Sequence, residues 1–196
     1  MNDDAVFRWV LIAGVLLVFP VAAYHRIRAH GTGEKLDRRQ EGWFLLISIR
    51  VVGISAMLAL ILYMIEPSWM AWSSVPLPAW LRWLGAALGV VIGALLFWTL
   101  HHLGKNLTDT VVTRQQHTLV TTGPYRWVRH PFYVCFGLAI VANSLVSANL
   151  FIFAAGVVVF TLLAIRMRKE EAKLLDRFGE EYRVYRERTG AFLPRF

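Results

Sequence analysis

Two clusters of polar side chains in the second half of this 196-residue sequence have residue types and spacing suited to a binding or catalytic site. The first lies in the segment from His117 to Tyr133, which reads HTLVTTGPYRWVRHPFY. Within it, Arg129 and His130 immediately precede Pro131, a residue that favours the first position of a helix. Because backbone N–H groups at a helix N-terminus attract anions, this cluster could bind a negatively charged group. The same basic and aromatic residues could equally anchor the chain at a membrane surface.

The second cluster consists of Arg166, Glu170 and Glu171. Arg166 and Glu170 are four residues apart, so on a helix they share one face. An arginine that precedes a glutamate is the weaker orientation for stabilising a helix, which argues against a pair that exists only for that purpose. A solvated charged face remains the simpler interpretation of these residues.

The elements that must position both clusters are apolar helices. Hydrophobic residues make up 57% of the chain and its mean hydropathy is +0.49, more than a soluble core of this size would bury. Three runs reach the roughly 20 residues that cross a bilayer. They are Ala5 to Tyr24, Trp43 to Ile65 and Trp80 to Leu103.

Two shorter apolar runs follow, Phe132 to Val146 and Leu150 to Arg166. Their short separation predicts an antiparallel hairpin. Since no breaker follows the second run, one long helix is expected from Leu150 to about Phe178, leaving the membrane near its end. The expected fold class is therefore all-α, a polytopic membrane bundle of about five transmembrane helices. Its last two helices form a tight hairpin, and a cytosolic helical extension follows them.

The basic residues predict the orientation of the bundle. They concentrate after the first and third apolar runs, and such segments are typically cytoplasmic. These residues are His25, Arg26, Arg28, Lys35, Arg38 and Arg39, and then Lys105, Arg114, Arg126 and Arg129. The turn from Glu66 to Pro78 has no Lys or Arg but carries Trp69 and Trp72, so it is expected outside, with the N-terminus. Acidic Asp3 and Asp4 precede the first run, which is the reverse of a cleaved signal. The net charge of +8 then indicates contact with membrane lipids and not with nucleic acid.

Together the two clusters carry a family resemblance. The first matches the pattern H-x-L-V-x-x-G-x-Y-x-x-x-R-H-P-x-Y, and the second begins the pattern E-E-x-x-L-x-x-x-F-G-x-x-Y-x-x-Y. The first comprises His117, Leu119, Val120, Gly123, Tyr125, Arg129, His130, Pro131 and Tyr133, and the second Glu170, Glu171, Leu174, Phe178, Gly179, Tyr182 and Tyr185. From Lys105 onward the sequence resembles the isoprenylcysteine carboxyl methyltransferase family and its prokaryotic relatives.

The resemblance implies methyl transfer from S-adenosylmethionine, bound beneath the cytosolic surface, to a lipid-like or lipidated acceptor that arrives from the bilayer. It implies a cofactor pocket lined by His117, Leu119, Val120, Tyr125, His130, Pro131, Tyr133 and Glu170. Arg166 would face the acceptor, and Arg166 and Glu170 would be the catalytic residues. Residues 1–103 would then hold three transmembrane helices with a basic loop at 25–42, and residues 104–196 the catalytic half. The small size is similar to that of prokaryotic members, which favours a prokaryotic inner membrane.

The acceptor stays open at this stage. A carboxylate acceptor needs no general base and Arg166 could orient it, whereas an amine would first lose a proton, for which Glu170 is the nearest base. An isoprenylated cysteine carboxylate, a phospholipid amine and a smaller hydrophobic molecule are all compatible with the motifs. The small residue that often follows the motif tyrosine by two positions is here Cys135, so the tightness of helix packing there is in question.

Two other functions compete with methyl transfer. One is an NADPH-dependent membrane reductase of the sterol-reductase type, which has a similar Arg-His and Tyr-rich layout. The other is a non-enzymatic membrane scaffold whose basic loops contact lipid or a partner. No metal site is expected, because the adjacent His101 and His102 do not share a helix face and the lone Cys135 lies in an apolar run.

Overall fold

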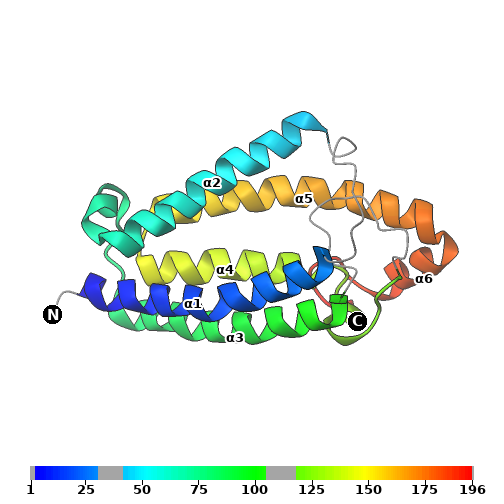
Figure 1. Cartoon of the computed structure of the whole chain (residues 1–196), viewed down its shortest axis with the longest axis horizontal. Coiled ribbons are helices and arrows are strands. Elements are labelled where there is room, and N and C mark those ends of the chain that lie inside the picture. The colour runs from blue at the N-terminus through cyan, green and yellow to red at the C-terminus, as the bar shows by residue number, and fades with distance from the viewer. Residues whose placement is uncertain (1–2, 31–41, 105–117, 196) are drawn as a thin grey trace.

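The computed structural model describes residues 3–30, 42–104 and 118–195, and these form an elongated bundle of helices (Figure 1). The bundle is built from five apolar helices. Their bounds are α1 Asp3–His30, α2 Trp43–Ile65, α3 Ala79–Leu103, α4 Pro131–Ser147 and α5 Leu150–Phe178. Short 3-10 helices, η2 (Pro67–Ser73) and η4 (Gly123–Arg126), precede α3 and α4, and α6 (Glu180–Arg188) follows α5. The part of the chain that the structure describes is thus all-helical, as the sequence predicts.

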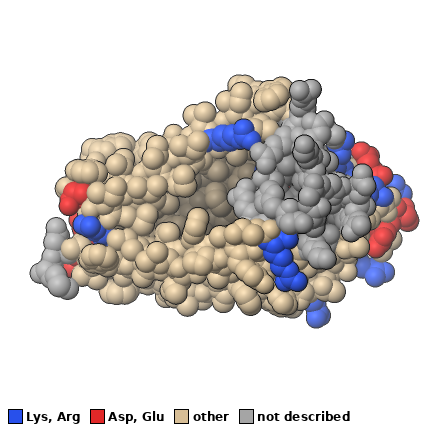
Figure 2. Space-filling model, in the orientation of Figure 1, with Lys and Arg blue, Asp and Glu red and all other residues tan. Residues whose placement is uncertain are grey.

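Four of these helices, α1, α2, α3 and α5, are long and apolar enough to cross a membrane. The fifth, α4, has 17 residues, which at about 1.5 Å per residue give about 26 Å, slightly less than a bilayer core. Charged side chains gather over α6 and the neighbouring end of α5, while the body of the molecule is mostly uncharged (Figure 2). The apolar lengths and the charge distribution fit an integral membrane protein.

Successive helices run in opposite directions along the bundle, so its two ends differ (Figure 1). The N-terminus, η2 and the α4–α5 turn lie at one end. The ends of α1, α3 and α5, the starts of α2 and α4, and helix α6 lie at the other. Residues 25–30, expected in a basic loop, instead continue α1, because no glycine or proline lies between Tyr24 and His30.

The turn between α4 and α5 is tight and well anchored. Ala148 adopts a left-handed conformation with φ of 48°, and the Asn149 side chain caps α5 by accepting from the Ile152 N–H at 3.1 Å. Asn149 also donates to the Met70 carbonyl at 3.0 Å, which ties the turn to η2. This pair of helices is the expected hairpin, and its anchor fixes how far each arm extends toward the opposite end.

Small residues let α4 approach its neighbours closely. A Cβ on Gly85 of α3 would lie 2.7 Å from the Leu145 Cβ, and one on Gly156 of α5 would lie 2.5 Å from Ile140 Cγ2. Close backbone approach is how helices pack when lipid provides no hydrophobic driving force between them. Cys135 is buried in the same layer beside Ile92 and Ala142, so this small residue does keep tight packing between α3 and α4.

Candidate functional site

The first turn of α4 meets the charged end of α5 at the end of the bundle that carries α6. Tyr133 donates from its hydroxyl to Glu170 Oε2 at 2.9 Å. Glu171 Oε1 lies 3.2 Å from His130 Nε2 and accepts from Arg129 Nε at 2.8 Å. Because adjacent residues on a helix point about 100° apart, the two glutamates reach different partners on α4. The two polar clusters of the sequence are therefore one cluster in space.

The pair between Arg129 and Glu171 is largely shielded from solvent. Their side chains are 10% and 14% exposed, respectively. Besides Glu171, the Arg129 guanidinium donates to the carbonyls of Arg186, at 3.2 Å, and Thr189. With its donors engaged in this way, Arg129 holds the end of α6 against the start of α4. The residue therefore positions its neighbours, while His130 and Tyr133 face the interior of the cluster.

A segment after α6, residues 189–192, packs along the residues that precede α4, and we refer to it as the C-terminal strap. Backbone N–H groups of Arg129 and His130 donate to the carbonyls of Gly190 and Ala191 at 2.9 and 3.1 Å. At its end, the Phe192 ring lies 6.4 Å from the His130 ring, centroid to centroid. The strap thus covers the residues that precede α4.

The same Phe192 ring also reaches the apolar part of α5, with its centroid 5.9 Å from that of Phe160. One aromatic side chain therefore touches both a polar residue of the cluster and a residue of a membrane-spanning helix. The strap consequently forms part of the boundary between the polar cluster and the apolar body of the bundle.

Two tyrosines, the buried Tyr125 and the half-buried Tyr185, form another wall of the cluster. Tyr185 of α6 donates from its hydroxyl to the Tyr125 carbonyl at 2.7 Å. Burial raises the pKa of Tyr185 to about 12, and burial followed by the nearby Glu170 carboxylate raises the pKa of the Tyr125 hydroxyl. Both hydroxyls therefore remain protonated near neutral pH. The Tyr185 hydroxyl is used in its bond to Tyr125, and the Tyr125 hydroxyl lies near Glu170.

The turn that carries Tyr125 rests on the end of α3. Gly123 has a φ of 60°, and a Cβ there would lie 2.5 Å from the His102 ring. Trp98 of α3 and Trp127 also pack, with ring centroids 5.5 Å apart. His102 is thus a packing surface for the turn. Among the described residues, no three His, Cys, Asp or Glu side chains converge in a way that could hold a metal ion.

The residues proposed from sequence for the site lie mostly together. Tyr125, His130, Pro131 and Tyr133 are buried, and Glu170 is half-buried against them. Leu119 and Val120 are half-buried in the irregular segment before η4, and Arg166 is half-buried one turn before Glu170 on α5. His117 lies outside the described residues.

Sequence reasoning did not find the strap or the tie that Arg129 makes to it. Glu171 and Arg129 both belong to the motifs, and their opposite charges could have predicted that they form an ion pair. No comparable signal existed for residues 189–192, because their contacts with the cluster are mainly backbone hydrogen bonds, which depend little on residue type.

Comparison with known proteins gives a consistent result. The model of the isoprenylcysteine carboxyl methyltransferase (ICMT) family matches residues 85–176, which include α4 and nearly all of α5. The nickel-cobalt-cadmium resistance protein NccN of Alcaligenes xylosoxydans xylosoxydans is 34% identical over 58% of this chain and 53% of its own length. Methanethiol S-methyltransferase of Mycobacterium tuberculosis is 39% identical over 46% of this chain and 34% of its own length. The chain thus spans about half or less of the length of these relatives.

A solved structure has the same fold. It is that of the eukaryotic intramembrane Ras methyltransferase ICMT, isoprenylcysteine carboxyl methyltransferase. The match covers 92% of this chain and 67% of that one, with a TM-score of 0.55 and 21% sequence identity. Nearly all of the bundle, and not only the segment matched by the family model, therefore follows that architecture.

Proposed function

Because this chain belongs to the isoprenylcysteine carboxyl methyltransferase family, we propose that it transfers a methyl group from S-adenosylmethionine to a hydrophobic acceptor at the cytoplasmic face of a membrane. The observation that carries the proposal is the convergence of Tyr133 with Glu170 and of His130 with Glu171, where α4 begins and α5 ends. Neither cluster alone offers both a carboxylate and an array of buried rings. Their meeting provides a polar, partly desolvated site beside the apolar bundle.

The residues present fit the chemistry of S-adenosylmethionine. Its methionyl end carries an ammonium, and the Glu170 carboxylate on α5 provides the complementary charge. Tyr133 donates to Oε2 of Glu170. Among the described residues no hydrogen bond to Oε1 is found, so this second oxygen can interact with a cation. The buried rings of Tyr125, Tyr133 and His130 are suited to packing on a planar base. When bound, S-adenosylmethionine supplies an electrophilic methyl on its sulfonium.

The protein's part in such a reaction is alignment and the exclusion of water. A methyl displacement needs the nucleophile, the methyl carbon and the leaving sulfur in line, so rigid positioning contributes most of the rate enhancement. The Arg129–Glu171 pair and the strap hold α4, α5 and α6 in fixed relation around the cluster. Phe192, with Phe160 behind it, keeps bulk water from the membrane side of the site.

The acceptor we propose is an anion on a hydrophobic molecule, with a carboxylate favoured by the family. A carboxylate or a thiolate attacks without a general base, and Arg166 would orient either one by its charge. The M. tuberculosis relative carries the name of a thiol methyltransferase, which extends the same logic to sulfur. On this proposal Glu170 holds the cofactor and does not act as a base.

We further propose that the site faces the cytoplasm and that the N-terminus lies on the opposite side of the membrane. Arg166, Arg168 and Lys169 begin the charged end of α5 directly after its apolar part, as expected of a helix leaving the inner leaflet. Residues 1–103 would then serve as the membrane scaffold, and residues 104–196 as the catalytic half.

The test is cofactor binding followed by transfer, on the full chain purified in detergent. Calorimetry should detect binding of S-adenosylmethionine and of its demethylated product, and no comparable binding of NADPH. Glu170→Gln should weaken cofactor binding about tenfold or more, because one charged hydrogen bond contributes about 1.5–3 kcal/mol. Glu181→Gln, the same change at an exposed position on α6, is the matched control and should bind normally.

Transfer is then measured with a radiolabelled methyl donor and four acceptors, namely a farnesylated cysteine analogue, a long-chain fatty acid, methanethiol and phosphatidylethanolamine. Labelling of a carboxylate or thiol supports the proposal. Binding of NADPH alone, or wild-type transfer by Glu170→Gln, would overturn it.

A further inference from the structure

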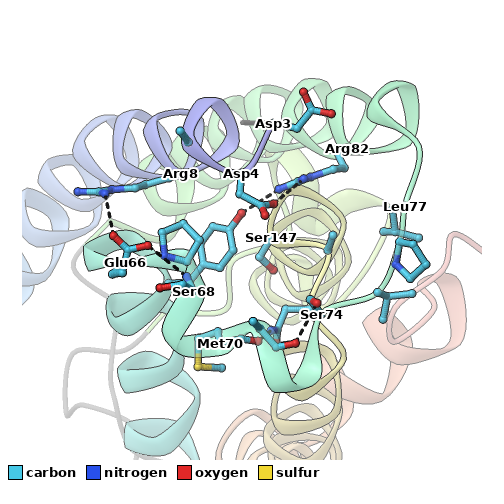
Figure 3. A pocket seen from close by; sticks show the side chains of 18 residues that line it. Asp3, Asp4, Arg8, Glu66, Ser68, Met70, Ser74, Leu77, Arg82 and Ser147 are labelled. Atoms are coloured by element: carbon cyan, nitrogen blue, oxygen red, sulfur yellow. Dashed lines mark hydrogen bonds and ion pairs between the residues drawn. The ribbon is translucent and has the colours of Figure 1, made fainter. Parts of the chain in front are cut away.

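The end of the bundle opposite the candidate site contains a cavity of about 550 Å³ (Figure 3). It lies between the first turns of α1, the end of α2, η2 and the turn between α4 and α5. Cavities that hold small molecules in proteins usually measure about 300–1,000 Å³, so this one is large enough for a ligand. The residues named for methyl transfer do not line it.

A buried arginine forms the floor of this cavity. Arg82 is 5% exposed, and its guanidinium donates to Asp4 Oδ1 and to the Tyr63 hydroxyl, both at 2.8 Å. Its Nε donates to the Val146 carbonyl at 3.0 Å, and its guanidinium carbon lies 4.0 Å from the centre of the Phe7 ring. These contacts join α1, α2, α3 and α4, so the floor is rigid and its charges are already matched.

The rim is charged but loosely paired. Arg8 and Glu66 approach to 4.0 Å, with side chains 30% and 46% exposed. Asp3, in the first turn of α1, also lines the cavity. A partly exposed ion pair at the limit of contact contributes little to stability, so a ligand can separate its members at low cost.

We propose that this cavity binds a small zwitterion that carries a phosphate or carboxylate and a primary ammonium, as in an ethanolamine phospholipid headgroup. The anion would meet Arg8, and the ammonium would meet Glu66 and Asp3. A purely anionic ligand would face the carboxylates of Asp3, Asp4 and Glu66, and a purely cationic one would face both arginines. A zwitterion satisfies the two sides of the rim at once.

The position of the rim favours a lipid as the source of this zwitterion. Trp9, Trp69 and Trp72 are all more than half exposed, and the Arg8 guanidinium carbon lies 5.5 Å from the Trp9 ring centre. Exposed tryptophans of membrane proteins gather at the depth of the headgroups. The cavity would therefore open where headgroups lie, and a free zwitterion of the same chemistry is the other source.

The test uses the full chain in detergent, with binding followed by the shift in melting temperature and by calorimetry. The probes are dioctanoyl phosphatidylethanolamine, phosphatidylcholine and phosphatidylglycerol, and soluble phosphoethanolamine. Saturable binding of the ethanolamine lipid, at least about tenfold tighter than binding of the choline and glycerol lipids, is the expected result. Equal binding of the lipid and of phosphoethanolamine supports the same site with a free zwitterion as its ligand.

Arg8→Gln and Glu66→Gln should each weaken this binding about tenfold, while Glu181→Gln on the far end of the molecule leaves it unchanged. Because the Arg8–Glu66 pair is partly exposed and at the limit of contact, both variants should melt within about 4 °C of the wild-type protein in the absence of lipid. Equal affinity for all three lipids, or wild-type affinity in both rim variants, would refute the proposal. S-adenosylmethionine binding by the same preparations reports separately on the candidate active site, so the two proposals fail independently.

Discussion

Glu170 and Glu171 are neighbours with the same charge, yet their contacts predict opposite effects of the same substitution. Glu171 accepts from Arg129 and lies beside His130, and both its side chain and that of Arg129 are at least 86% shielded from solvent. Glu170 accepts from Tyr133 through Oε2, and its other oxygen is the one that we propose for the ligand. Replacing each with glutamine keeps the shape and removes the charge. The expected result is that Glu171→Gln destabilises the fold and Glu170→Gln does not.

The size of the effect follows from the contacts. Truncating one partner of a buried ion pair costs about 3–5 kcal/mol, and a glutamine that keeps one acceptor recovers part of this, which leaves about 2–3 kcal/mol. For a chain of this length each kcal/mol corresponds to about 2–4 °C, so Glu171→Gln should melt roughly 4–12 °C below the wild-type protein. Glu170→Gln loses one hydrogen bond strengthened by charge, and the new amide can still accept from Tyr133, so its melting temperature should change by about 4 °C or less.

The assay is thermal unfolding in detergent, followed by tryptophan fluorescence, together with calorimetric titration of S-adenosylmethionine. Glu170→Gln should lose affinity at nearly constant melting temperature, and Glu171→Gln should lose melting temperature first. If the two variants melt together, or if Glu170→Gln is the less stable one, the assignment of one glutamate to the ligand and the other to the fold is wrong.

Three further results are expected. Gly123→Ala should lower the melting temperature, because it strains a positive φ and places a Cβ against His102, and His102→Ala in the same chain should relieve only the steric part of the loss. Asn149→Ala, measured in the same way, should cost about 1–3 kcal/mol, since it removes the cap of α5 and leaves the Met70 carbonyl without this donor. Phe192→Ala should raise the KM for a hydrophobic acceptor several-fold while cofactor affinity stays within about twofold, because the backbone bonds of the strap remain; equal losses in both would contradict the boundary role given to this ring.

The helices were predictable from sequence because length and hydropathy are local properties. The predicted bounds of α2 and α5 match the observed ones, since Glu66 and Gly179 follow them directly and end the helical pattern. The first helix was predicted too short, because the charged residues after Tyr24 were assigned to a loop although none of them breaks a helix.

Contacts between helices were predictable only where the motifs implied them. The family pattern led us to expect Glu170 near the start of α4, and Tyr133 indeed donates to it. Which glutamate would meet Arg129 depends on the rotation of α5 about its axis, which no local pattern specifies. The strap and the Arg82 network join residues tens of positions apart through carbonyls and a buried guanidinium, so neither left a periodic trace in the sequence.

The span of chain between Arg129 and its partners in the strap also bears on biosynthesis. The Arg129 guanidinium and the Thr189 carbonyl are 60 residues apart, and the whole α4–α5 hairpin lies between them. Arg129 is therefore synthesised well before these acceptors. The contacts that join the start of α4 to the strap can form only after the chain has passed through the whole hairpin and α6.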